Sequence, residues 1–148
     1  MTDRNPSLVA AGSLSLAAAA LHLALIAGGG DWYRFFGAGE GIARAAERGS
    51  PVPALMTVAI AAILGLWAAY AFSGAGLIRR LPLIRTGLIV ISAIYLVRGL
   101  LMFLPLPADP SAPPGFMLWS SLIVLLFGFA YAFGTWRAWP HLSKRKSA

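Results

Sequence analysis

The chain has 148 residues, of which 59% are hydrophobic and 11% are charged. Because soluble domains carry roughly 25% charged residues, this composition excludes an ordinary water-soluble fold and indicates an integral membrane protein. The absence of cysteine excludes disulfides and thiolate metal sites, and the net charge of +7 is dispersed among membrane-flanking segments rather than gathered on a face that would bind nucleic acid.

Four apolar segments predict four membrane-spanning helices, since each is close to the ~20 residues that cross a hydrocarbon core of ~30 Å. Their expected bounds are 7–29, 52–76, 86–104 and 115–139. The spans leave room only for short connections and tails, so the whole chain is predicted to be one all-α domain, a four-helix transmembrane bundle. The first segment is longer than the apolar core of a secretory signal, which favours a retained helix over a cleaved one.

The connection at 31–50, DWYRFFGAGEGIARAAERGS, is the most unusual segment of the chain. The aromatic residues among 32–36 suit the lipid headgroup level, where such rings gather. The pattern over 40–48 predicts a short interfacial helix, in which Glu40 and Arg44 are spaced for an i,i+4 ion pair.

The second span carries a stripe of small residues that recur every four positions: Thr57, Ala61, Gly65, Ala69 and Ser73. Such stripes let another helix approach closely in a membrane. Two interpretations stay open. The stripe packs the monomer, or it forms a homo-oligomer through Ala61, Gly65 and Ala69.

Two further connections differ in character. The segment LIRRLPLIR, at 77–85, is short enough to force the second and third spans into an antiparallel hairpin. The segment at 105–114 holds five prolines and no Lys or Arg, which predicts a stiff, extended cover on the outer side.

Lys and Arg residues outside the spans divide unevenly between the two sides of the membrane. Cytoplasmic loops carry the excess of these residues, so the division predicts that both termini lie inside. Arg4, Arg79, Arg80, Arg85, Arg137, Lys144, Arg145 and Lys146 would share the inner side, and Arg34, Arg44 and Arg48 the outer side.

Arg98 and His22 lie inside predicted spans, where ionisable groups are costly unless they are paired or used. Each is about 9 Å below the outer end of its span at ~1.5 Å per residue, so the two are expected at one depth. Tyr95 lies three residues before Arg98 and projects from the same side of the helix. These positions predict a polar, outward-facing pocket whose residues are Arg98, His22, Tyr95 and, from the covering loop, Asp31, Trp32 and Glu40.

A guanidinium recognises carboxylates and phosphates, so the expected ligand of this pocket is a small anionic or lipid-like molecule, bound for transport or sensing. Structural alternatives stay open. Arg98 pairs with Glu40 or Asp31, or extends to the interface; His22 makes one structural hydrogen bond; Glu40 makes a surface pair with Arg44.

Two other functions also fit the sequence. One is an intramembrane enzyme acting on a lipid or isoprenoid, with His22 as its acid or base. The other is an oligomeric scaffold or accessory subunit without a pocket. No catalytic residue, metal or cofactor is predicted, because His22 is the one histidine within the spans and His141 falls in the inner tail.

The run DWYRFFGAGE, followed by a short Ala/Arg/Glu helix and a second span that begins with proline, resembles a stretch of small four-span bacterial inner-membrane proteins with no assigned activity. The resemblance covers about 21–98. It implies a multi-pass protein of the bacterial inner membrane with a four-helix bundle, and it implies no mechanism.

Overall fold

The computed structural model describes residues 4–104 and 115–143, and within these ranges the chain is helical and contains no strand. The prediction of an all-α fold is confirmed. The expected cover at 105–114 and the basic residues after 143 lie outside the described residues. The elements are α1 (Pro6–Phe35), α2 (Glu40–Glu47), α3 (Val52–Gly74), α4 (Ile84–Leu100), a short 3₁₀ turn (Leu101–Phe103) and α5 (Phe116–Ser143).

Three of these helices, α1, α3 and α5, are long and apolar enough to cross a membrane. They indicate a membrane protein and match three of the four predicted spans closely. The fourth predicted span corresponds to α4, which has 17 residues and is therefore shorter than the ~20 residues of a typical crossing.

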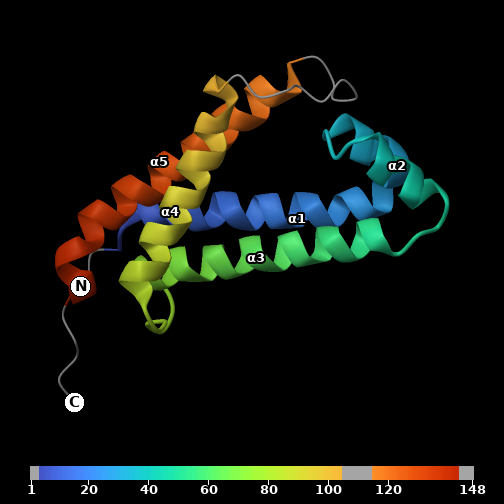
Figure 1. The fold of residues 1–148 in the computed structure, drawn as a ribbon. Coiled ribbons are helices and arrows are strands. Elements are labelled where there is room, and N and C mark those ends of the chain that lie inside the picture. Colours follow the sequence, from blue (N-terminus) through green and yellow to red (C-terminus); the bar gives the residue numbers. More distant parts are fainter. Residues whose placement is uncertain (1–3, 105–114, 144–148) are drawn as a thin grey trace.

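The long helices associate as two pairs, α1 along α3 and α4 along α5 (Figure 1). The pairs meet near the N-terminus of α1 and spread apart toward α2. Asn5 ties the pairs together where they meet, because its side-chain amide donates a hydrogen bond to the Gly134 carbonyl of α5 at 2.8 Å while its oxygen caps α1. The start of α1, the α3–α4 connection and the end of α5 therefore share one end of the molecule, here called the basic end.

A buried hydroxyl cluster joins the two pairs. The Ser15 hydroxyl of α1 lies 3.0 Å from the Tyr95 hydroxyl of α4 and 2.9 Å from the Tyr131 hydroxyl of α5. The ring of Trp67, from α3, packs edge-on against Tyr95 with centroids 4.9 Å apart. All four long helices thus contribute to one core, whose polar atoms satisfy one another.

The first helix continues past its predicted end, so the expectation that 31–35 form a loop is wrong. Gly29 adopts φ 63° and ψ −152°, a conformation that essentially only glycine takes, and the helix resumes after it. The resumed turn is held by Tyr33, which is buried and lies 3.0 Å from the Thr57 hydroxyl of α3. Glycine absorbs the break locally, and tertiary contacts then make a second helical piece favourable.

The predicted helix at 40–48 is confirmed as α2, and its predicted ion pair is present, with Arg44 Nε 2.7 Å from Glu40 Oε1.

The small-residue stripe of α3 is only partly covered by the chain itself. Ala61 is buried within the chain, whereas a Cβ added at Gly65 would meet nothing within 4 Å. Part of the stripe therefore packs this chain, and the predicted oligomer through Gly65 and Ala69 stays a prediction.

Candidate functional site

The structure does not bring Arg98 and His22 together. Arg98 belongs to α4 and its Nη1 lies 3.4 Å from the Ser121 hydroxyl of α5. His22 belongs to α1 and its Nδ1 donates to the Ala18 carbonyl, one turn earlier in its own helix, at 2.8 Å. Because α1 and α4 sit in different pairs, which spread apart at this end (Figure 1), equal depth in the membrane does not produce a shared pocket.

Tyr95 does not line a pocket with Arg98 either. Its side chain is 5% exposed, and its hydroxyl turns into the core toward Ser15. The aromatic rings of Trp67, Phe127 and Tyr131 surround it, so Tyr95 packs the junction of the pairs. Helical spacing puts Tyr95 and Arg98 on one side of α4 but does not decide which neighbour each meets.

The carboxylates expected near Arg98 lie instead on Arg34. Arg34 Nε is 2.8 Å from Glu40 Oε2, and its Nη1 is 3.3 Å from Asp31 and 2.5 Å from Glu47. Hydrogen bonds from Arg34 and then Arg44 lower the pKa of Glu40 from 4.5 to about 2. This cluster fastens α2 to the end of α1. The sequence signal for it was the i,i+3 spacing of Asp31 and Arg34, which is visible only if 31–35 are taken as helical.

Trp32, the remaining residue of the predicted cover, is 43% exposed. Its ring packs at a tilt on Phe36, with centroids 6.1 Å apart. Trp32 thus packs on Phe36, the C-cap of its own helix, and this contact does not involve Arg98.

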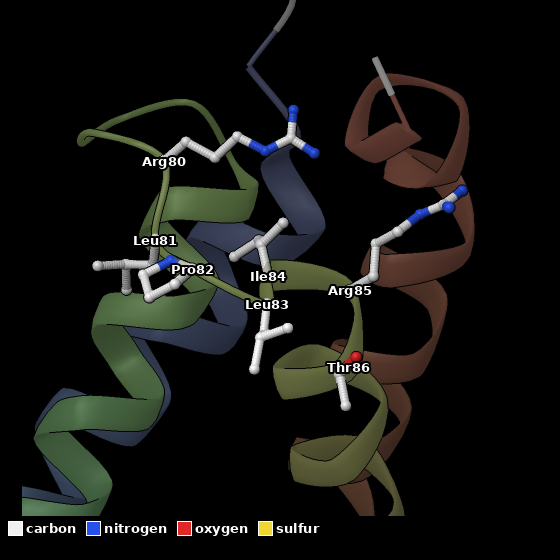
Figure 2. A pocket seen from close by; sticks show the side chains of 7 residues that line it. All are labelled: Arg80, Leu81, Pro82, Leu83, Ile84, Arg85 and Thr86. Carbon is white, nitrogen blue, oxygen red and sulfur yellow. The ribbon is translucent and has the colours of Figure 1, made fainter. Parts of the chain in front are cut away.

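A hollow of about 620 Å³ lies at the opposite, basic end, on the connection between α3 and α4 (Figure 2). The connection has a defined shape because Ser73 of α3 donates to the Arg79 carbonyl at 3.0 Å and accepts from the Leu81 amide at 2.9 Å. The residues that line the hollow are Arg80, Leu81, Pro82, Leu83, Ile84, Arg85 and Thr86.

Two guanidinium groups border this hollow, and Figure 2 shows both side chains reaching across from the connection toward the end of the molecule where α1 begins and α5 ends. Arg80 donates to the Leu142 carbonyl near the end of α5, which is a favourable partner for a cation. The Arg85 guanidinium lies 4.1 Å from the centroid of the Trp139 ring. These two contacts are made with neutral groups.

Charge is segregated along the molecule. In residues 4–104 and 115–143 the carboxylates are Asp31, Glu40 and Glu47, and they lie at the α2 end. The basic end carries arginines from three segments: Arg4, Arg79, Arg80, Arg85 and Arg137. The hollow therefore sits in a positive potential that the described carboxylates are too far away to neutralise.

Comparison with protein-family models, curated proteins and solved structures finds no match to this chain. In the described part of the chain, no three His, Asp or Glu side chains gather where they could hold a metal ion. The two guanidinium groups at the basic end are of a type that can donate hydrogen bonds to an anion.

Proposed function

We propose that this chain is a four-span membrane protein that binds a small anionic, lipid-like ligand at the basic end, with the anionic group at Arg80 and Arg85. The observation that carries the proposal is the hollow between these two arginines in a region whose described charges are positive. Guanidinium groups bind phosphate and carboxylate oxygens in a planar fork, and clustered Lys and Arg at a membrane surface attract anionic lipids.

The exposed side of α4 supports its assignment as the fourth span. Val90, Ile94 and Val97 are each more than 40% exposed in the isolated chain, as lipid-facing residues would be. At ~1.5 Å per residue the 17 residues of α4 measure about 26 Å, and the 3₁₀ turn that follows extends the segment toward the ~30 Å of the hydrocarbon core.

The gathering of the start of α1, the α3–α4 connection and the end of α5 at one end supports a topology with both termini inside. Under the positive-inside preference, the basic end then faces the cytoplasm. Together with the resemblance to bacterial inner-membrane proteins, this supports a location of the proposed site at the cytoplasmic leaflet of the inner membrane.

The intramembrane enzyme is a weaker candidate, because the hydrogen bond recorded for His22 goes to a backbone carbonyl of its own helix and not to an acid-base partner.

Thermal unfolding in detergent tests the binding proposal. Dioleoyl phosphatidylglycerol is expected to raise the melting temperature more than dioleoyl phosphatidylcholine does, because ligand that binds only the folded state stabilises it. The double variant Arg80→Gln, Arg85→Gln should lose this difference. Arg48→Gln removes one positive charge at the α2 end and should keep this difference. Equal effects of the two lipids on the parent protein would refute the proposal.

A further inference from the structure

A second hollow, of about 460 Å³, runs between α4 and α5 and is almost wholly apolar. Its length along α4, from Ile89 to Leu96, is about 10 Å at ~1.5 Å per residue. Its walls are formed by residues of α4 and α5. The lining residues are Ile89, Ser92, Ala93, Leu96, Ala132, Thr135, Trp136 and Trp139.

One wall of this groove holds an unsatisfied polar group. Thr135 is 5% exposed, and its hydroxyl has no hydrogen-bond partner among the described residues. The other hydroxyl of the groove, on Ser92, is already used, since it donates to the Leu88 carbonyl at 2.7 Å. A buried hydroxyl without a partner is costly, so Thr135 would gain stability from a hydrogen-bond partner.

The groove and the basic hollow adjoin at the contact between Trp139 and Arg85. Trp139 lines the groove and carries the Arg85 guanidinium at 4.1 Å from its ring centroid. Ile89 follows Arg85 by four residues and so lies one turn along the same face of α4. Thr135 precedes Trp139 by the same interval, which places its hydroxyl one turn deeper than the arginine. Charge, hydroxyl and apolar groove therefore follow one another in the order of a phospholipid's phosphate, ester and acyl chain.

We infer that the α4–α5 groove seats one acyl chain of an anionic phospholipid whose phosphate lies at the basic hollow, with Thr135 donating a hydrogen bond to its ester carbonyl. This inference rests on the proposed function and adds the part of the ligand that the groove recognises. Because lipid is already apolar, the groove selects by shape and by the Thr135 hydrogen bond rather than by the hydrophobic effect.

Native mass spectrometry from detergent tests headgroup binding at the basic hollow and acyl-chain binding in the groove separately, because the headgroup preference and the chain-length preference are measured with different lipid pairs. Preference for phosphatidylglycerol over phosphatidylcholine reports the basic hollow. Preference for dioleoyl over dibutanoyl phosphatidylglycerol reports the groove, because a four-carbon chain is too short to occupy a groove of about 10 Å. Ala132→Leu and Ala93→Leu fill the groove, and Ala62→Leu makes the same change at an exposed position of α3.

The groove variants are expected to lower the affinity for the dioleoyl lipid about tenfold, since several methylenes lose their seat, and to leave the headgroup preference intact. Thr135→Val should weaken both chain lengths alike. Ala62→Leu should match the parent protein. A parent protein with headgroup preference but no chain-length preference would overturn the inference and leave the proposed function standing. Groove variants that keep the parent's chain-length preference would do the same. A parent without headgroup preference would overturn the proposed function and the inference with it.

Discussion

Ser15 joins three helices through one oxygen atom. A hydroxyl has one donor and two acceptor sites, so Ser15 can hydrogen-bond to Tyr95 and Tyr131 at the same time, at 3.0 and 2.9 Å. Ser15 and Tyr131 are completely buried, and no water competes for these groups. The two helix pairs are therefore held in register where they cross.

Removing the Ser15 hydroxyl should lower the free energy of unfolding more than removing either tyrosine hydroxyl does. Ser15→Ala leaves both tyrosine hydroxyls without this partner, and we expect a loss of about 1–2 kcal/mol in unfolding free energy. Tyr131→Phe should cost less, because Ser15 keeps Tyr95. Unfolding in mixed micelles measures the difference, with the exposed Ser13→Ala as a control of the same kind on the same helix. A Ser15→Ala variant as stable as Ser13→Ala would show that the cluster does not hold the pairs.

At the residue level, the sequence predicts the depth of a side chain in the membrane but not the helix that the side chain faces. Counting residues along the helices predicts that Arg98 and His22 lie at one depth. The glycine and apolar patterns do not predict that their two helices diverge. From the sequence, Arg80 and Arg85 serve only to predict topology. The fold of the α3–α4 connection depends on the two hydrogen bonds of Ser73, which no local sequence pattern predicts.

The fastening of α2 to α1 is the clearest feature at the scale of elements. Arg34 receives carboxylates from its own helix and from α2, so three acidic side chains converge on one guanidinium. The hydrogen bonds from Arg34 also lower the pKa of Glu47. Both glutamates are thus held ionised by the contact that docks the helix.

Docking of α2 should depend on pH in a specific window. The pKa of Glu40 is 4.5 ordinarily and about 2 when docked, so its contribution is fully present above about pH 4.5 and is lost as the pH falls toward 2. Hydrogen–deuterium exchange of α2 amides, corrected for intrinsic rates, should rise in that interval. Glu40→Gln should weaken docking above about pH 4.5, where the carboxylate contributes fully, and should flatten the pH dependence. Loss of protection that is already complete at about pH 4.5 would contradict the ion-pair geometry.

Apolar length predicts α1, α3 and α5 well because the need to cross a bilayer with satisfied backbone hydrogen bonds is local to each segment. The extension of α1 through 31–35 escaped prediction for the opposite reason. It depends on a conformation of Gly29 that glycine alone tolerates and on the distant contact between Tyr33 and Thr57.

At the scale of the whole molecule, charge is arranged along one axis. The carboxylates of the described residues cluster at α2, and the arginines of three segments gather at the other end. Such an axis gives the protein one orientation in a membrane whose cytoplasmic leaflet is negative.

The orientation can be measured directly because the chain has no cysteine. Ile78→Cys lies in the α3–α4 connection, and Arg48→Cys lies just after α2; both positions are exposed. A membrane-impermeant maleimide should label Arg48→Cys in intact spheroplasts and Ile78→Cys only after permeabilisation. Labelling of both sites from one side would show that α3 does not cross the membrane and would refute the four-span topology.

If guanidinium groups at the basic end select an anionic lipid, the purified protein should retain that lipid in preference to a zwitterionic one. After reconstitution in nanodiscs with equal amounts of phosphatidylglycerol and phosphatidylcholine, native mass spectrometry should find phosphatidylglycerol enriched on the parent protein and on Arg48→Gln. The Arg80→Gln, Arg85→Gln double variant should retain the two lipids in the bulk ratio. A parent protein that itself retains the bulk ratio would contradict the claim.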